Sequence, residues 1–503
     1  MLFEAGDSLL QGFSIALTLK NLWYCFVGVT VGNIVGVLPG FGPVSAVAIL
    51  IPLIFGVEPV SAIILLAGIY YGAMYGGSIT SILLKVPGES SSVMTAIDGY
   101  ELALKGRAGP ALGISAIASF VAGTISIIFL TFFAPLLAGF ALSFGAPEYF
   151  SLMVMGFAAV AVLSTGDALK GGISALLGII LATVGSDVIT GTPRFHFGSI
   201  YLLDGIDFLV VAIGVFAFAE VLDNIVTKSK FDKRISYGKW TNLLPSLNDL
   251  KVSFWPIIRA TFIGFATGVL PGAGATIASF ISYATEKRVS KYPEKFGTGV
   301  MEAVAGPEAA NNAATGGAMV PLLTLGIPGS NVTAVMLGAL MILGLQPGPL
   351  LFKEHPTFVW GLIASMYLGN AMLLILNFPL IGIFVQVLRF SYPIIAILVL
   401  EISLVGVYAF NNNIFDLYIM FVFGIMGFLL KKLDFPLAPM ILALVLGRMF
   451  EEHCRRSLII SDGSFTIFLT RPISLTLLVV AVLVMFYPMI LDFIRQHRRG
   501  KDK

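Results

Sequence analysis

Apolar runs long enough to cross a lipid bilayer recur along this chain, and several are interrupted by Pro-Gly pairs. The segment 22–66 has no Lys or Arg and one acidic residue, Glu58, yet VLPGFG stands inside it at 37–42. A helix needs about 20 apolar residues to span the hydrocarbon core, and Pro and Gly disfavour the interior of such a helix. The sequence therefore predicts membrane helices that stop and restart at membrane depth.

The composition fits only a membrane protein. The 503 residues are 57% hydrophobic and 12% charged, whereas soluble proteins carry roughly 25% charged residues. Two cysteines, Cys25 and Cys454, make no disulfide framework or metal cluster, and there is no HExxH motif or GK[ST] phosphate loop. We predict an all-α polytopic membrane protein that needs no cofactor and is not an enzyme.

The opening hexapeptide returns as VLPGAG at 269–274, and the chain is predicted to be an internal duplication. The same spacing relates Trp23 to Trp255, Gly32 to Gly264 and Gly36 to Gly268. GGSITSILLKVPG at 76–88 is likewise echoed by GGAMVPLLTLGIPG at 316–329. Duplications of this kind build many secondary transporters.

Charge placement predicts that the two repeats have inverted topology. The second-half loop at 286–297 is strongly basic, while its first-half counterpart, 57–59, has no basic residue. Because short cytoplasmic loops collect Lys and Arg, equivalent loops are expected to face opposite sides, with the N-terminus periplasmic and the C-terminus cytoplasmic. Arg448, Arg455, Arg456 and Arg471 fit this orientation less well.

Five segments follow from the duplication and the charges. They are an N-terminal interfacial helix (1–21), a first transmembrane repeat (22–222), a basic cytoplasmic linker (223–254), a second transmembrane repeat (255–447), and a final segment (448–503) with a polar loop, an extra transmembrane helix and a basic cytoplasmic tail. The sequence leaves open whether the interrupted hairpins cross the membrane fully or re-enter it.

Each Pro-Gly pair is expected to leave a helix start just beyond it. The free N–H groups and positive dipole end of such a start favour an anion, and irregular backbone inside a bilayer is tolerated only in protein or beside a watery cavity. Pro87-Gly88 and Pro328-Gly329 repeat the device and precede ESSS and SNVT. A single such pair is more often a kink or a loop end, but the repetition favours a substrate or ion site.

GPEAANNAATGG at 306–317 is the most polar stretch within an apolar crossing. Asn311 and Asn312 follow Glu308 by three and four residues, so all three share one helix face and could hold a coupling cation. The alternative for Glu308 is structural, since Pro307 suits a first helical turn and an acid there complements the dipole. Glu220 and Glu401 are weaker ion-site candidates.

These motifs resemble the large permease subunit of the tripartite tricarboxylate transporter family. The resemblance is specific from Gly28 to Phe352, above all in 37–100 and 306–352, and looser to the C-terminus. Ala303 and Gly306 depart from the expected pattern, where Gly and Ala would stand. The resemblance implies a bacterial inner-membrane symporter subunit that works with a small membrane subunit and a periplasmic solute-binding protein, and takes up a citrate-like carboxylate with Na⁺ or H⁺.

The resemblance also transfers site residues onto the matching motifs. The substrate-binding candidates are Gly40, Gly42, Pro43, Ser90, Ser91, Gly272, Gly274, Gly329, Ser330 and Asn331, and the coupling-ion candidates are Glu308, Asn311 and Asn312. We expect secondary active transport of a di- or tricarboxylate held between the two LPGxG breaks. The alternatives are a passive channel or scaffold subunit and, less favoured, an intramembrane enzyme.

Overall fold

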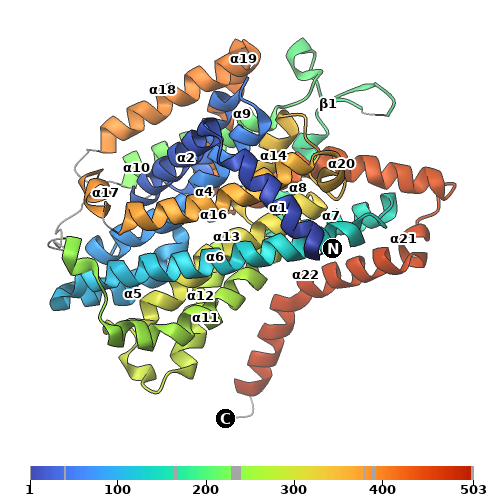
Figure 1. Ribbon diagram of the computed structural model, residues 1–503. Coiled ribbons are helices and arrows are strands. Elements are labelled where there is room, and N and C mark those ends of the chain that lie inside the picture. Colours follow the sequence, from blue (N-terminus) through green and yellow to red (C-terminus); the bar gives the residue numbers. More distant parts are fainter. Residues whose placement is uncertain are drawn as a thin grey trace.

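The computed structural model is a bundle of helices with a single pair of two-residue strands in the part of the chain it describes (Figure 1). The described residues are 2–38, 41–163, 168–187, 189–227, 240–272, 274–378, 380–387 and 392–499. Much of the predicted basic linker, Pro39, Gly40 and the last tail residues lie outside them. The predicted all-α class is confirmed.

The described residues of the first half form fifteen helical segments and the two strands. They are α1 (Leu2–Ala16), α2 (Leu19–Val37), α3 (Pro43–Leu50), η1 (Ile51–Ile54), α4 (Pro59–Leu84), η2 (Ser90–Ser92), α5 (Val93–Leu102), η3 (Ala103–Arg107), α6 (Ala108–Ala141), α7 (Ala146–Leu163), α8 (Ala168–Ala182), β1 (Gly185–Ser186), β2 (Pro193–Arg194), η4 (Ile200–Leu202), α9 (Phe208–Ala212), η5 (Ile213–Phe218) and α10 (Ala219–Thr227).

The second half is wholly helical within the described ranges. Its segments are η6 (Trp240–Leu243), α11 (Leu247–Val269), α12 (Gly274–Val289), η7 (Pro293–Lys295), α13 (Glu302–Leu325), α14 (Asn331–Ile342), α15 (Leu351–Glu354), α16 (Pro356–Asn377), α17 (Ile381–Val387), α18 (Tyr392–Asn411), α19 (Ile414–Lys432), α20 (Ala438–Ile460), α21 (Ile467–Thr470) and α22 (Pro472–Arg499).

The chain is a multi-pass membrane protein. Six described helices are long and apolar enough to cross a bilayer: Pro59–Leu84, Ser90–Ala141, Phe208–Val226, Leu247–Val269, Pro356–Asn377 and Ile414–Lys432. A seventh span is possible if α1 and α2 count together, although they are bent by 84°. Gly12 of α1 lies against the backbone of Trp360 in α16, so the N-terminal helix packs on the bundle.

Three Pro-Gly pairs fall between a helix end and a new helix start, as predicted, and helices also end before and begin after Pro39 and Gly40, which lie outside the described residues. α2 stops at Val37 and α3 begins at Pro43, while α11 stops at Val269 and α12 begins at Gly274. The later pairs separate α4 from η2 and α13 from α14. The breaks therefore end helices instead of kinking them.

The two halves use matching glycines to bring helices into close contact. A methyl group on Gly32 or Gly36 of α2 would overlap the backbone of α4, at Ile69 and Ala73. A methyl group on Gly264 or Gly268 of α11 would overlap the backbone of α13 at Ala310 and Ala314 in the same way. Small residues let membrane helices approach at backbone distance, and here the repeated sequence gives a repeated packing unit.

Four long helices, α4, α6, α13 and α16, form the centre of the bundle and exchange polar contacts. Figure 1 shows α6, α13 and α16 side by side through the middle of the molecule. Asn370 of α16 accepts a hydrogen bond from the Tyr75 hydroxyl of α4 at 2.7 Å and donates to the Phe120 carbonyl of α6 at 2.9 Å. Ser126 of α6 donates to the Ala313 carbonyl of α13 at 2.6 Å.

Glu101 lies at one end of these four central helices. Its carboxylate pairs with Lys85, which directly follows α4, at 3.1 Å. The backbone at Glu101 also lies against Gly299, three residues before α13 begins. The end of α4 and the start of α13 are therefore neighbours.

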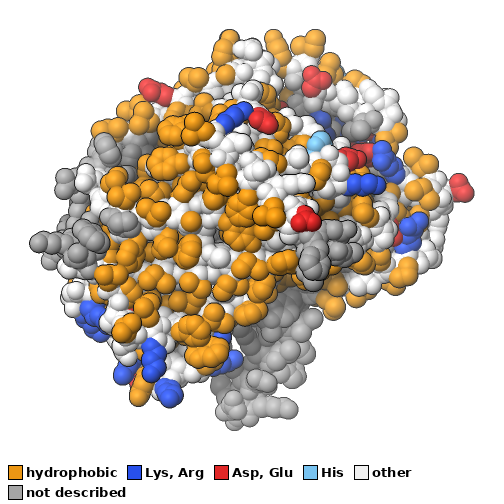
Figure 2. Space-filling model, in the orientation of Figure 1, with side chains coloured by type: hydrophobic (Ala, Val, Ile, Leu, Met, Phe, Trp, Pro, Cys, Tyr) orange, Lys and Arg blue, Asp and Glu red, His pale blue; other side chains and the backbone are white. Residues whose placement is uncertain are grey.

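Charged side chains gather at the ends of the helices, and hydrophobic side chains cover the face between them (Figure 2). One group holds Arg107 paired with Asp249 at 2.7 Å and Lys105 donating to the Thr298 carbonyl at 2.5 Å. The other group links the β1–β2 loop to the far end of α20, and it includes the pairs Arg194–Glu451, Arg455–Asp187 and Arg456–Glu452. Of the four arginines that fit the predicted topology poorly, Arg455 and Arg456 are therefore paired with acids.

Asp187 should make the stability of this second group dependent on pH. Its carboxylate accepts from the Thr190 N–H at 2.7 Å and the Ile189 N–H at 2.9 Å and pairs with Arg455 at 2.8 Å. The Thr190 N–H, aided by the other partners, holds the pKa of Asp187 well below its usual range. Because the folded-state pKa is depressed, this stabilisation is complete above about pH 4 and is lost as the pH falls.

We therefore expect Asp187→Asn to lower the thermal unfolding temperature at neutral pH, and to lower it less as the pH approaches about 3. Unfolding of the detergent-solubilised chain, measured across this pH range, provides the test. Exposed Asp462→Asn is the control and should change little at any pH. An Asp187→Asn effect that is equal at all pH values would contradict the assignment.

Candidate functional site

A cavity of about 280 Å³ lies where the interrupted segments of the two halves meet. Seven of the ten predicted substrate-binding residues line it: Gly42, Pro43, Ser90, Gly272, Gly274, Ser330 and Asn331. They come from three separate helix starts and one short η2 turn. The structure thus brings together residues that lie almost 290 positions apart at the extremes.

Three α-helix N-termini border this cavity: those of α3, α12 and α14. α3 begins at Pro43, whose missing N–H costs nothing at a first turn, and α14 begins after the N-cap Ser330. Gly272 and Gly274 have φ of +78° and +58°, a backbone that glycine adopts without strain and that turns the chain sharply into α12. Free N–H groups and dipole ends of one sign therefore face the same space.

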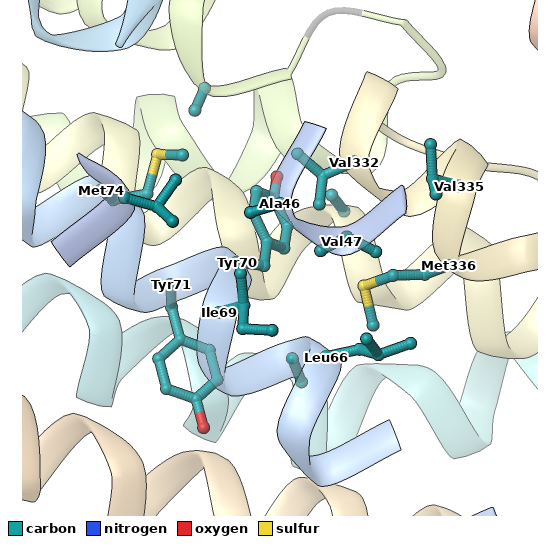
Figure 3. Close-up of a cluster of buried hydrophobic side chains, with 14 of the residues drawn as sticks. Ala46, Val47, Leu66, Ile69, Tyr70, Tyr71, Met74, Val332, Val335 and Met336 are labelled. Atoms are coloured by element: carbon teal, nitrogen blue, oxygen red, sulfur yellow. The ribbon is translucent and has the colours of Figure 1, made fainter. Parts of the chain in front are cut away.

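Two hydrogen bonds join the halves across the cavity. The Tyr70 hydroxyl of α4 donates to Ser330 Oγ at 3.0 Å, and Ser90 Oγ lies 2.8 Å from Thr276 Oγ1 of α12. Beside Tyr70, side chains such as Val47, Val332 and Met336 form a buried apolar layer (Figure 3). Figure 3 also shows Tyr71 directed away from this layer, on the opposite side of α4.

Glu89 is the cavity residue that the sequence reasoning did not single out. It is 9% exposed, and it is the one charged side chain among the described lining residues. Its Oε1 accepts from the Ser91 N–H at 3.1 Å, and Ser92 Oγ donates to its carbonyl at 2.8 Å. The ESSS sequence could have drawn attention to Glu89, because an acid followed by serines after a Pro-Gly turn is typical of a helix N-cap.

Three predicted substrate residues do not line the described cavity. Gly40 lies outside the described residues. Ser91 is buried, with its Oγ donating to Met74 Sδ at 3.4 Å and its backbone N–H donating to Glu89 Oε1. Gly329 packs against the Gly268 carbonyl and allows the turn to approach α11.

The three coupling-ion candidates form a separate buried polar cluster on α13. Glu308 and Asn311 are fully buried and Asn312 is 2% exposed. Asn312 Nδ2 donates to Ser119 Oγ of α6 at 2.8 Å and to Asn311 Oδ1 at 2.6 Å. Glu308 Oε1 accepts from the Thr95 hydroxyl of α5, and Ser78 and Ser115 border the same carboxylate.

Two atoms of this cluster lack hydrogen-bond partners within the described part of the chain: Glu308 Oε2 and Asn311 Nδ2. A buried carboxylate oxygen without a partner is costly, and it is the kind of ligand that a hard cation takes. Carboxylate, amide and hydroxyl oxygens from α4, α5, α6 and α13 surround it. The described residues contain no cluster of three His, Cys, Asp or Glu, so the donor set fits Na⁺ or H⁺ better than a transition metal.

The structural alternative for Glu308 was based on a wrong helix start. α13 begins at Glu302, so Pro307 and Glu308 lie in its second turn, beyond the first-turn N–H groups. Glu308 therefore does not serve as a helix-start acid. The weaker ion candidates lie elsewhere: Glu220 pairs with Lys431 at 2.7 Å, and Glu401 is exposed on α18.

Similarity to known proteins shows the family of the chain. Residues 22–442 match the family model described as the tripartite tricarboxylate transporter TctA family. An "Uncharacterized 52.8 kDa protein in TAR-I ttuC' 3'region" of Agrobacterium vitis is 47% identical over 476 residues, which cover 95% of this chain and 94% of that protein.

A second protein of Agrobacterium vitis, "Uncharacterized protein in TAR-II ttuC' 3'region", is 47% identical over 215 residues, covering 43% of this chain and 89% of that protein. No solved structure matches the chain.

Proposed function

Because the chain belongs to the tripartite tricarboxylate transporter TctA family, we propose that it is the large membrane subunit of a secondary active carboxylate uptake system. A di- or tricarboxylate, delivered by a periplasmic solute-binding protein, binds in the cavity between the two LPGxG breaks. A small membrane subunit completes the complex in the bacterial inner membrane. Uptake is driven by a Na⁺ or H⁺ gradient, and the chain needs no cofactor.

The observation that carries this proposal is the convergence of three helix N-termini and the Ser90, Ser330 and Thr276 hydroxyls on one cavity whose described lining residues include no basic side chain. Dipole ends and hydroxyls suit carboxylate oxygens. They hold an anion without the fixed counter-charge of Lys or Arg, which favours release as well as binding. Discontinuous helices with N-termini aimed at an anionic substrate group are a known device of transporters.

The cluster of Glu308, Asn311 and Asn312 is the proposed site of the coupling cation. It lies on α13, whose far end leads through Pro328-Gly329 to the cavity residue Ser330. A cation that occupies this cluster neutralises Glu308 next to the anion site. Filling of one site therefore favours filling of the other, which is the linkage that symport requires.

The neighbouring ends of α4 and α13 support inverted topology for the two repeats, since matching helices then run in opposite directions. We propose that alternating access follows from movement of one repeat against the other around the shared cavity. The Lys105 and Arg107 end faces the cytoplasm in this arrangement, in line with the excess of basic residues there. The β1–β2 loop and the far end of α20 then face the periplasm.

Ser330→Ala and Asn311→Ala test the two sites separately. We expect Ser330→Ala to raise the half-saturating carboxylate concentration by about tenfold, since one hydrogen bond to a charged group contributes about 1.5 kcal/mol or more. Asn311→Ala should instead raise the half-saturating cation concentration. Uptake of labelled succinate, malate or citrate by the reconstituted complex is the measurement, and unchanged uptake in both variants would refute the assignment.

A passive channel or scaffold subunit and an intramembrane enzyme are the alternatives. Accumulation of substrate against its own gradient would exclude a channel or scaffold. Collapse of that accumulation by an ionophore would separate a gradient-driven transporter from an enzyme, whose turnover would not respond.

A further inference from the structure

We propose that Glu89 binds one proton together with each substrate anion and carries it across the membrane. This inference rests on the proposed function and deepens it, because it names a proton as a co-transported ion and the carboxyl group that holds it. The proton is separate from the cation proposed for the Glu308 cluster.

The placement of Glu89 creates a conflict that only protonation resolves. Its carboxylate lines a cavity built to attract negative charge, and it is more than nine-tenths buried there. In the empty cavity the helix N-termini that would hold a substrate can hold ionised Glu89 instead, with Oε1 accepting from the Ser91 N–H. When a carboxylate substrate enters, two negative charges lie in the same cavity.

The groups that face Glu89 do not relieve this repulsion. α4 contributes the Tyr70 hydroxyl and α13 contributes the Glu308 carboxylate, both close enough to interact with Glu89 electrostatically. η2 and α12 contribute the neutral hydroxyls of Ser90 and Thr276. No Lys, Arg or His belongs to the described lining, so neither element supplies a compensating positive side chain.

Protonation of Glu89 therefore accompanies anion binding. A like charge and burial both favour the neutral form of a carboxylic acid, and the arriving substrate strengthens both influences. The loaded cavity then holds the substrate and a neutral Glu89, while the empty cavity holds an ionised Glu89. The proton makes the loaded cavity one unit less negative than it would otherwise be, which lowers the cost of moving the loaded state across the membrane.

The test is the pH dependence of substrate exchange by the reconstituted complex with labelled succinate, malate and citrate. Above about pH 7, where these probes are fully ionised, the wild type should need about tenfold more probe per pH unit for half-saturation, as one linked proton requires. Net probe uptake into vesicles that contain no probe should also acidify the vesicle interior, followed by a trapped pH-sensitive dye. In Glu89→Gln both the pH slope and the acidification should disappear.

Two further variants make the result decisive. Glu101→Gln, a partly exposed acid of α5 outside the cavity, should keep the slope and the acidification. Glu89→Asp keeps a carboxyl group and should retain both, so loss of both in Glu89→Asp and Glu89→Gln alike would overturn the proposal. Persistence of the slope or of proton entry in Glu89→Gln would also overturn it. Absence of exchange in the wild type with every probe would instead count against the proposed function.

Discussion

Glu308→Gln is expected to leave the chain at least as stable as the wild type while it removes ion-driven uptake. Glu308 is fully buried in the centre of the bundle, and its Oε2 has no partner within the described residues. A buried carboxylate that has neutral hydroxyl partners and no positive charge beside it costs several kcal/mol, and a neutral amide of the same shape avoids that cost. A residue retained for structure would show the opposite sign.

The expected functional loss is large. One charged ligand contributes about 3 kcal/mol to ion binding, so its removal should weaken the coupling ion about 100-fold and reduce ion-driven uptake accordingly. Thermal unfolding should show the same effect, because a ligand that binds only the folded state stabilises it. Added Na⁺ should raise the unfolding temperature of the wild type and have little effect on Glu308→Gln if Na⁺ is the ion held by this cluster.

Glu286→Gln is the matched control. Glu286 is also buried, at 2% exposure, but its carboxylate pairs with Arg259 at 2.5 Å. Its removal leaves Arg259 without its partner, and we expect a clear drop in unfolding temperature. Should Glu308→Gln lose stability as Glu286→Gln does, with uptake falling only in proportion to folded protein, Glu308 would be a structural residue.

The sequence was informative where a local rule governs the structure. Pro and Gly end helices by backbone chemistry alone, so the four breaks could be located from residue type. The duplication then placed the breaks in pairs, and the cavity formed where helix starts such as Pro43 and Gly274 converge. The core of the candidate site followed from these two observations, whereas the fold class followed from the apolar runs and the low content of charged residues.

Other features depended on long-range contacts that no local pattern reveals. Asn312 donates a hydrogen bond to Ser119, 193 positions away, and this contact joins α13 to α6. The rule that places Pro in a first helical turn gave the wrong start for α13, because the helix begins at Glu302 and contains Pro307 in its interior. The sequence did not identify Glu89 as a cavity residue, because its place there depends on how the short η2 turn packs in the fold. No motif or residue spacing in the sequence reports that packing.

Gly88 and Gly329, the glycines of the later Pro-Gly pair in each half, should not tolerate replacement even by alanine. A methyl group on Gly88 would overlap the Gly36 carbonyl oxygen, and one on Gly329 would overlap the Gly268 carbonyl oxygen. Both obstacles are backbone atoms of a helix that itself packs at backbone distance, so neither can rotate away as a side chain would. Each turn must instead move outward, and it carries the adjacent cavity residues Glu89 or Ser330 with it.

We expect Gly88→Ala and Gly329→Ala each to destabilise the chain by about 1–3 kcal/mol, as overpacking does, and to abolish high-affinity substrate binding. The double variant should lose close to the sum, because the two contacts lie in different repeats. Folded yield and unfolding temperature measure the first effect, and probe binding measures the second. Gly139→Ala is the control: open space surrounds that α6 position, and helix propensity predicts a gain of about 0.5–1 kcal/mol. If Gly88→Ala and Gly329→Ala behaved like this control, each turn would have moved without any effect on binding. The close contact of each turn with its helix would then not be what positions the cavity residues.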